Sequence, residues 1–563
     1  MNFDPPFDDS KIDQSALKQV QAAVEATEPR PASEFVNPKE STGVQRRAIA
    51  NLVGIESGIV HCALKVDAKA PKLGDFVAIK TGRSLACAAV HGLKRDPAQN
   101  IVEIKAQLVG EIIQHDGRRY FSRGINIQPP MDAPVFLARR RDLELIYHPT
   151  RTEHVHIGSL RANDDVPAHL ATDDLLGKHF AVIGSTGSGK SCALTVMLGA
   201  VLKEHPKAHV LLIDPHNEYH KAFSNVSNRL AVQDLELPFW LMTFEEFSAV
   251  IIPNRGPDYE AQYSILKKAV LEAKRGGMNN SIGVGPRREY SVDAPVPFRM
   301  ADLREAIEEL MGKLNKSTTS APHRYLLERI DNIENDKRFW FLVPPKATND
   351  NMRQILSSLL RIPVDEKPLT IVDISGVPAE VVNVVVAMLS RLIFEFKVWA
   401  PRNRTPPVLL VCEEAHRYVP NADQGQEKPA QRAIDQIARE GRKYGVGLGL
   451  VSQRPADLSP TSLSQCGTIV TLRLTSERDQ EFVRRILPEG SNGMLGQLPT
   501  LGTGEAVVVG EAAPLPMQIA FENLPPERQP NSGTPSFAKA WRENIADEGL
   551  VDEVILRWRG ARR

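Results

Sequence analysis

Residues 184–191 read Gly-Ser-Thr-Gly-Ser-Gly-Lys-Ser, a spacing that suits the binding of a phosphate chain. Glycine tolerates backbone conformations that aim successive N–H groups at one anion. Lys190 can reach the outer phosphates of a nucleoside triphosphate, and the Ser191 hydroxyl can hold Mg²⁺. An apolar run precedes the loop and a helical pattern follows it, so the pattern predicts ATP and Mg²⁺ as cofactors. The residues expected to bind the nucleotide are Gly184, Ser185, Thr186, Gly187, Ser188, Gly189, Lys190, Ser191 and Cys192.

Two adjacent carboxylates follow the apolar run 407–412. If this run is a strand of the same sheet, its end brings Glu413 toward Mg²⁺ and its waters, and Glu414 toward the water that attacks the terminal phosphate. An ordinary strand that ends in a solvated acidic turn is the alternative interpretation. The phosphate-binding pattern upstream favours the first, with Glu413 as a metal ligand and Glu414 as a catalytic residue.

Polar side chains also follow two other apolar runs. Gln453 comes directly after the run 446–451, where it could sense the terminal phosphate or orient water. A plain polar end to a strand is the alternative. Asp214 and Glu218 come after the run 210–213, and for these two the sequence favours structural hydrogen bonding and catalysis equally.

Three basic residues could complete a catalytic site. Machines that transfer phosphoryl groups often need a cation, which a neighbouring subunit can supply. Arg439 and Arg442 end a helical pattern just before the strand of Gln453, and Lys178 stands just before the strand that leads to the glycine-rich loop. A basic residue at the end of a helix can also simply complement the helix dipole, so both interpretations stay open.

The elements that position these residues are read from the apolar pattern. Short apolar runs separated by helical patterns are typical of an α/β fold with a parallel sheet covered on both faces. Residues 45–140 differ, since short apolar stretches alternate there with Gly, Asp and Pro turns, which predicts a small all-β barrel. The five strands expected in the parallel sheet are 179–183, 210–213, 369–374, 408–411 and 446–451.

This pattern divides the chain into domains. We expect a mobile N-terminal arm over residues 1–40, the β-barrel over 41–150 and the α/β core over 165–525, with residues 141–178 as a connector. A mostly helical insert is expected over about 235–365, and a C-terminal strap with a helix near 537–546 over 526–563. A basic, glycine-rich stretch at 274–290 is expected to form a loop within the insert.

Composition limits the classes of protein that the chain can belong to. The 69 basic and 69 acidic residues give a formal net charge of zero, which removes the simplest argument for nucleic-acid binding but allows a locally basic channel. The five cysteines show no metal-binding spacing, which argues against a zinc site or a disulfide framework and predicts a cytoplasmic location. No run approaches 18 apolar residues, so no membrane span is expected.

An ordered set of motifs resembles the HerA family of hexameric ATPases, within the larger HerA/FtsK group. Besides the glycine-rich loop, the set contains IDPHNEY, TIVDISGVP, EEAHRYVP, REGRKYGVGLGLVSQRP and CGTIVTLRLTSERD, in the order of the family. The sequence departs from the family at two places. Glu413 stands where many relatives have aspartate, and Lys178 matches the arginine of the family that acts on a neighbouring subunit.

The resemblance implies a homo-hexameric ring with a RecA-like P-loop core, a HAS-like N-terminal barrel and a C-terminal strap that reaches a neighbour. It also implies an ATPase that moves along double-stranded DNA, as a translocase or helicase. Partners implied by the family are a nuclease of the NurA type or, in bacteria, sirtuin-like NAD-consuming proteins and other effectors of phage defence.

Two functions from different classes remain open at this point. The first is the DNA motor, with the basic stretch 274–288 touching DNA phosphates or, alternatively, forming an ordinary surface loop. The second is a nucleotide-gated ring that assembles and regulates an effector enzyme, which the near-neutral charge favours.

Overall fold

The computed structural model describes residues 46–559, apart from 83, 97–100, 116–117, 150, 152, 232–235, 280–290, 314–319, 344–349, 402–403, 422–427, 488–491, 532–536 and 543–547. The N-terminal arm expected over residues 1–40 lies outside the described residues. Among those that are described, no helix is both long and apolar enough to cross a membrane.

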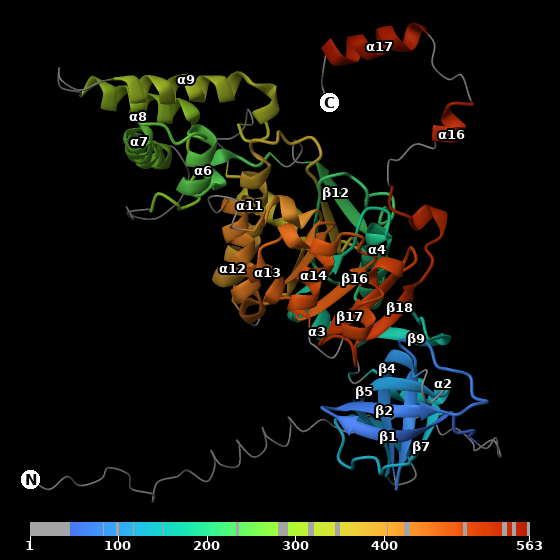
Figure 1. Ribbon diagram of the computed structural model, residues 1–563. Coiled ribbons are helices and arrows are strands. Elements are labelled where there is room, and N and C mark those ends of the chain that lie inside the picture. The colour runs from blue at the N-terminus through green and yellow to red at the C-terminus, as the bar shows by residue number, and fades with distance from the viewer. Residues whose placement is uncertain are drawn as a thin grey trace, which may run out of the picture. The chain divides into compact units, whose positions relative to one another are not determined.

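The first folded part is a small antiparallel β-barrel, as the sequence predicts (Figure 1). Six strands close on themselves because β2 pairs with both β1 and β5, and a seventh strand, β6, extends one side. Alternate side chains point inward and form a core that includes Leu52, Val60 and Ile104. The barrel strands are β1 (Ala50–Glu56), β2 (Ile59–Leu64), β3 (Phe76–Thr81), β4 (Ser84–Asp96), β5 (Ile101–His115), β6 (Arg118–Arg123) and β7 (Pro134–Leu137).

An 11-stranded sheet carries the rest of the chain, in the order β12-β13-β11-β14-β15-β10-β16-β17-β18-β8-β9. The first seven strands run parallel, and the last four run antiparallel to their neighbours. All five predicted strands are present, each within one residue of its expected ends. The strands of the parallel part are β12 (Ser227–Ala231), β13 (Leu369–Asp373), β11 (Val210–Asp214), β14 (Val408–Cys412), β15 (Val446–Ser452), β10 (Phe180–Ile183) and β16 (Thr468–Leu472).

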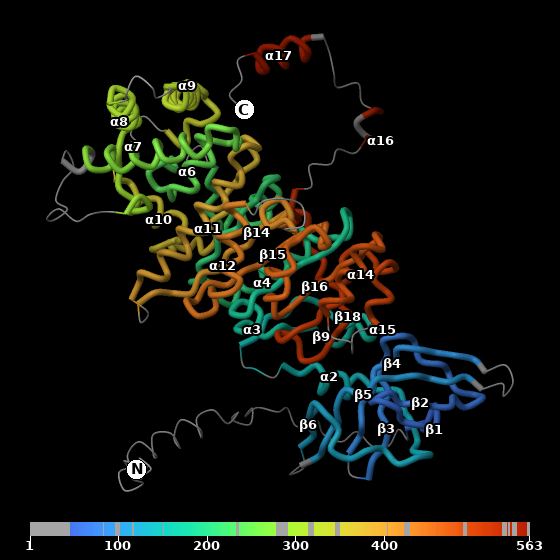
Figure 2. The backbone as a smooth tube through the Cα atoms, turned by 60° about the vertical axis from the view of Figure 1, so that its left-hand side comes forward, coloured from blue at the N-terminus to red at the C-terminus, as the bar shows by residue number. Residues whose placement is uncertain are grey.

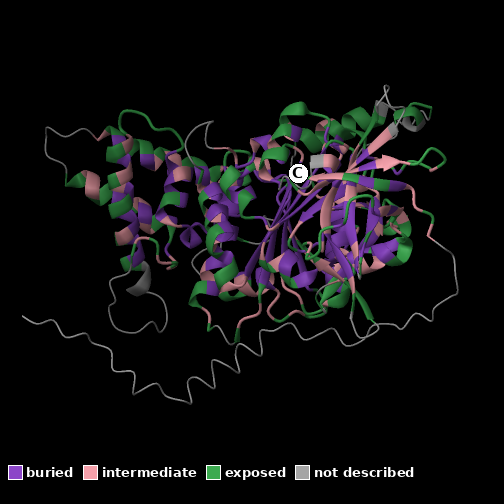
Figure 3. Ribbon diagram, turned by 60° about the horizontal axis from the view of Figure 1, so that its bottom comes forward, coloured by how far each residue is buried: buried purple, intermediate pink, exposed green. Residues whose placement is uncertain are grey.

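Helices cover both faces of this sheet, which gives the RecA-like core that the resemblance implies. The central strands are buried on both faces and are drawn in purple between helices whose outer sides are exposed (Figure 3). Gly449 in β15 shows how closely the layers pack, because a Cβ atom there would lie 2.5 Å from the Phe180 ring. The helices that begin or end near the site are α4 (Lys190–Glu204), α11 (Val382–Trp399) and α12 (Pro429–Tyr444).

The prediction of a connector over residues 141–178 is wrong. This segment contains α2 (Arg140–Ile146), the hairpin β8 (His154–Leu160) and β9 (Asn163–Ala171), and α3 (Thr172–Gly177). Strand β8 pairs with β18 (Met517–Phe521), which itself pairs with β17 (Glu505–Gly510), so the segment completes the antiparallel end of the sheet. The sequence did not show this, because the partners lie at opposite ends of the core.

The predicted helical insert is present between β12 and β13. Its first four helices, α6 to α9, lie together in both Figure 1 and Figure 2, and α7 and α8 bury apolar residues such as Leu266 and Leu303 in one common core. The insert helices are α6 (Phe244–Ile251), α7 (Tyr259–Asn279), α8 (Met300–Gly312), α9 (Ala321–Asn335) and α10 (Met352–Leu360).

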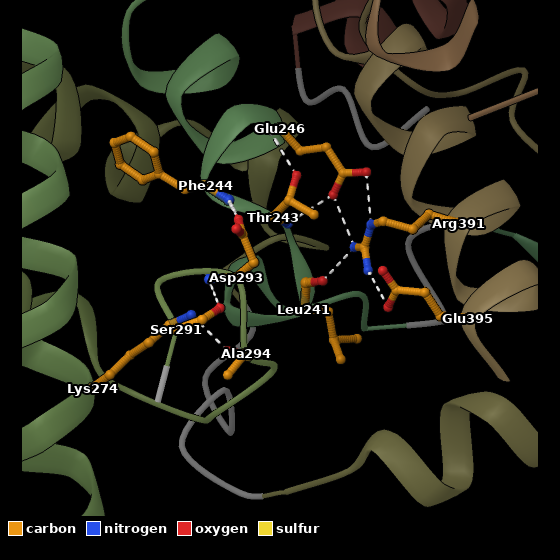
Figure 4. A network of polar contacts seen from close by, with 10 residues as sticks. All are labelled: Leu241, Thr243, Phe244, Glu246, Lys274, Ser291, Asp293, Ala294, Arg391 and Glu395. Carbon is orange, nitrogen blue, oxygen red and sulfur yellow. Dashed lines mark hydrogen bonds and ion pairs between the residues drawn. The ribbon is translucent and has the colours of Figure 1, made fainter. Parts of the chain in front are cut away.

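A buried polar network fastens the insert to α11 (Figure 4). The Arg391 guanidinium donates to both carboxylate oxygens of Glu246, at 3.0 and 2.9 Å, and to the Leu241 carbonyl at 2.6 Å. In the same region the Lys274 ammonium donates to the carbonyls of Val292 and Ala294, at 2.5 and 2.7 Å. Burial lowers the pKa of Lys274 to about 8.

This network corrects the expected role of the basic stretch. Lys274 lies in α7 and is 3% exposed, so it is a structural residue and cannot touch DNA. The remainder of the stretch, from residue 280 onward, lies outside the described residues.

After β18 the chain crosses its own core. The Lys221 ammonium donates to the Pro526 carbonyl at 3.2 Å, and the backbone N–H of Asn531 donates to the Glu218 carbonyl at 2.8 Å. The helix expected near 537–546 begins as predicted but is short, as α16 (Phe537–Ala540), and the longer helix is α17 (Glu548–Arg559).

Candidate nucleotide site

The glycine-rich loop lies at the carboxyl edge of the parallel sheet, between β10 and α4. Gly187 and Gly189 have φ of +75° and +96°, conformations that side chains with a Cβ rarely adopt. Gly189 caps α4, whose first residue is Lys190. The N-terminus of a 15-residue helix therefore opens at the loop, as an anion site requires.

Other strand ends hold the loop from outside. Gly184 N–H donates to the Ser452 carbonyl at 3.2 Å, and Ser185 N–H donates to the Arg473 carbonyl at 2.9 Å. The Arg473 guanidinium donates to the Gly187 carbonyl at 3.2 Å. The loop conformation is thus fixed by β15 and β16 before any ligand binds, which lowers the entropy cost of binding.

Polar atoms without partners show that the site suits a charged ligand. Ser188 Oγ and Glu413 Oε2 are buried and have no hydrogen-bond partner in the structure. At Gly187 no heavy atom lies within 4 Å of the position that a Cβ would take, so the loop faces open space at this residue. A bound nucleotide with Mg²⁺ and its waters would supply partners of the right charge to these atoms.

The two carboxylates after β14 lie as the sequence predicts, close to the loop. Glu414 Oε1 is 3.8 Å from the Lys190 ammonium, and both side chains are 9% exposed. Glu414 has φ of +51°, a strained conformation for a residue other than glycine and one that is often found at functional sites. Its other oxygen is 3.3 Å from His416 Nδ1. Strand β15 lies between β14 and β10, so the carboxylates reach the loop across one intervening strand.

Burial dominates the electrostatics of these acids. Glu413 is 3% exposed, and burial raises the pKa of its carboxyl to about 8. Burial also lowers the pKa of His416, which accordingly favours the neutral ring. The His416 ring nitrogen Nδ1 is 3.2 Å from Ser452 Oγ.

The turn after β11 contributes a residue for which the sequence left two interpretations open. Glu218 Oε2 accepts a hydrogen bond from Ser191 Oγ at 2.9 Å, so Glu218 belongs to the site. Asp214 has a structural task instead, since its carboxylate accepts the N–H groups of His216 and Tyr219, both at 3.1 Å. Burial raises the pKa of Asp214.

The remaining predicted residues of this edge are also nearby. Gln453 Oε1 accepts a hydrogen bond from Thr186 Oγ1 at 2.5 Å, so it touches the loop directly. Cys192 is partly exposed in the first turn of α4, and burial raises the pKa of its thiol. Arg473 was not predicted; a basic residue directly after the apolar stretch 468–472 is the signal that could have indicated it.

The three predicted cations do not join this site within one chain. Lys178 precedes β10, whereas the loop follows it, so the strand separates them by roughly 13 Å. Lys178 forms ion pairs with Asp174, at 2.7 Å, and with Glu511. Arg439 and Arg442 lie at the end of α12, just before β15 begins, which places them at the amino edge of the sheet as well.

Comparisons with known proteins agree on one family. The model of "Helicase HerA, central domain" matches residues 155–393, and that of "Helicase HerA-like C-terminal" matches residues 370–551. The chain is 27% identical to the "DNA double-strand break repair helicase HerA" of Pyrococcus furiosus, over 76% of this chain and 78% of the relative. It is 28% identical to a "Probable DNA double-strand break repair helicase HerA" of Methanocaldococcus jannaschii, over 76% and 87%.

Solved structures with a similar fold include VirB4 of Thermoanaerobacter pseudethanolicus, with 16% identity and a TM-score of 0.49 over 67% of this chain and 98% of that chain. The bacterial conjugative coupling protein TrwB is 13% identical, with a TM-score of 0.45 over 70% and 94%.

Proposed function

Because this chain belongs to the HerA family, we propose that it is an ATPase that uses hydrolysis to move along double-stranded DNA. One observation supports this above all. The ammonium of Lys190, which ends the glycine-rich loop, lies 3.8 Å from the Glu414 carboxylate at one edge of the sheet, where the loop can bind phosphates and the acid can activate water.

In the proposed reaction each residue of the site has a task. The N–H groups of residues 184–191 and the start of α4 hold the phosphates, and Lys190 exchanges its contact with Glu414 for one with the terminal phosphates. Ser191 and Glu413 would hold Mg²⁺ and its waters, and the bound ion would supply positive charge to neutralise the phosphate oxygens. Glu414 orients the attacking water and accepts its proton, while Gln453, which touches the loop, reports the state of the terminal phosphate.

We further propose that the active form is a homo-hexamer. Within one chain, Lys190 contacts Glu414 and Arg473 contacts the glycine-rich loop. The exposed Arg439 and Arg442 instead lie together at the opposite edge of the sheet. In a ring, that edge would face the nucleotide of the next subunit, as the resemblance implies for Lys178. The exposed apolar side chains of α17, which include Val551, Leu556 and Trp558, also favour contact with another chain.

Steady-state ATP turnover, measured with and without linear double-stranded DNA, tests this function. We expect DNA to stimulate turnover and the stimulation to weaken as salt rises, because phosphate contacts release counterions. Lys190→Ala should abolish turnover with and without DNA. Turnover at the wild-type level in Lys190→Ala would show that hydrolysis occurs elsewhere.

A second candidate is a nucleotide-gated ring that controls an effector enzyme, such as a nuclease of the NurA type or a sirtuin-like protein. The formal net charge of zero favours it, because a protein that only tracks DNA would be expected to be more basic. The same assay separates the two functions. Stimulation of turnover by a co-purifying protein but not by DNA would support the scaffold.

A further inference from the structure

The hydrogen bond between Ser191 and Glu218 joins two motifs of the sequence, the glycine-rich loop and the turn that follows β11. Ser191 lies in the first turn of α4, and its Oγ donates to Glu218 Oε2 at 2.9 Å. The acids that follow β14 make no described hydrogen bond with Ser191. Oε2 of the first of them, Glu413, is buried without a partner.

Several contacts hold the turn that carries Glu218. The fully buried Asp214 accepts the N–H groups on both sides of the turn, at 3.1 Å each, and Tyr219 next to it is fully buried. From the C-terminal side, the N–H of Asn531 donates to the Glu218 carbonyl at 2.8 Å. Because these hydrogen bonds fix the backbone of the turn, the Glu218 side chain has few alternative positions. The fold therefore places Glu218 next to Ser191.

The chemistry of a serine ligand explains why such an acceptor is useful. A hydroxyl has one proton and two lone pairs, and it binds a cation through a lone pair. Its O–H must then point away from the ion and donate a hydrogen bond to an acceptor. The groups that accept hydrogen bonds from metal ligands usually tune metal affinity. In this chain, Glu218 is the acceptor that the structure provides.

We propose that Glu218 is a positioning residue for the divalent cation. Its carboxylate accepts the hydrogen bond of the Ser191 hydroxyl, which would leave the hydroxyl lone pairs free to bind Mg²⁺, and it would add a negative charge to the metal site. This inference rests on the proposed ATPase function, because it needs a site that binds a metal–nucleotide complex. It also links the C-terminal segment to the metal site, through the contact between Asn531 and the backbone of Glu218.

The test compares nucleotide binding with and without metal in the full-length chain. Fluorescence titration with a non-hydrolysable ATP analogue in Mg²⁺ and in EDTA gives the two affinities, and Mn²⁺ binding followed by electron paramagnetic resonance measures the metal directly. We expect Glu218→Ala to weaken Mn²⁺ binding about 10- to 100-fold in the presence of the analogue, with the affinity in EDTA changed less than about twofold. Glu204→Ala, at an exposed glutamate at the other end of α4, is the matched control and should change neither value.

A conservative variant keeps the test independent of folding. In Glu218→Gln the amide oxygen can still accept the hydrogen bond of the Ser191 hydroxyl while the charge is lost, so metal binding should weaken less than in Glu218→Ala. Adding Glu218→Ala to Ser191→Ala should weaken metal binding less than Glu218→Ala does in the wild type, since part of the effect of Glu218 acts through Ser191 and only its charge acts on the ion without it.

The outcomes separate the inference from the function on which it rests. If the wild type binds the metal–nucleotide complex and Glu218→Ala binds Mn²⁺ equally well, the positioning role is wrong and the ATPase site stands. Equal weakening in Mg²⁺ and in EDTA would show that Glu218 only supports the loop. If the wild type binds nucleotide without any dependence on metal, the proposed ATPase function itself fails.

Discussion

Replacing Glu414 by glutamine should separate ATP binding from ATP hydrolysis. The substitution keeps the shape of the side chain and removes its negative charge. In the structure that charge lies 3.8 Å from the Lys190 ammonium, in a place where both side chains are 9% exposed. ATP must therefore draw Lys190 away from Glu414, and its phosphates must also approach a carboxylate of like charge.

The distance sets the size of the effect on binding. Two unit charges 3.8 Å apart attract by about 4 kcal/mol at an effective dielectric constant of about 20. ATP recovers most of this energy through its own contact with Lys190. If a third of the attraction between Lys190 and Glu414 is lost when ATP binds to the wild type, Glu414→Gln avoids that loss. Its free energy of ATP binding is then more favourable by about 1.4 kcal/mol, which is about a tenfold tighter affinity. Loss of a group that accepts a proton from water should slow hydrolysis about 10²- to 10⁴-fold.

Two measurements decide the matter. Equilibrium titration with ATP and Mg²⁺ gives the affinity of the variant, and phosphate release under saturating ATP gives its turnover. Glu204→Gln serves as the control for a change of charge on the surface. Turnover within threefold of the wild type would show that another group activates water, and weaker ATP binding would contradict the competition for Lys190 that the geometry indicates.

Three further predictions concern other parts of the chain. Gly189→Ala forces a Cβ into a residue with φ of +96°, a strain of about 1–3 kcal/mol, so ATP affinity should fall roughly 5- to 150-fold in a calorimetric titration. Arg391→Met leaves the buried Glu246 without its cation, at a cost of about 3–5 kcal/mol, and should lower the Tm by several degrees in scanning calorimetry. Arg432→Met, which removes an exposed ion pair, is its control and should leave the Tm nearly unchanged. Lys178→Ala should lower turnover at least about tenfold with ATP affinity unchanged, and equal loss of both would indicate a structural role.

Five of the seven parallel strands could be predicted from the sequence, because their physical signal is local, whereas β12 and β16 were not predicted. A strand buried on both faces is a short, continuous apolar run, and β14 and β15 are such runs. Strand β12 (Ser-Asn-Arg-Leu-Ala) lies at the edge of the sheet, where polar side chains remain partly exposed, so it lacks that signal and was missed. The hairpin of β8 and β9 was missed because its partner β18 lies far along the chain, and no local pattern reports such a pairing.

The site could be predicted where one motif carries the chemistry. The glycine-rich loop and the acid pair of Glu413 and Glu414 need only the order of strands in a parallel sheet to be brought together. The contact of Glu218 with Ser191 depends on the course of a tight turn, which the residue types alone do not fix. The burial of Lys274 likewise depends on how the insert folds over it, since its sequence neighbours are basic and glycine-rich like those of a surface loop.

The pairing of β8 with β18 sets the order in which this protein can fold during its synthesis. The hairpin leaves the ribosome early, but the strand that completes its sheet emerges only after nearly the whole core. At about 5–20 residues per second, the hairpin waits roughly 20–70 s with an unpaired edge. Such an edge is a template for wrong strand pairing. The nascent chain should therefore need chaperones during this interval, and a fragment that begins at residue 165 should aggregate, because it leaves β18 without its partner.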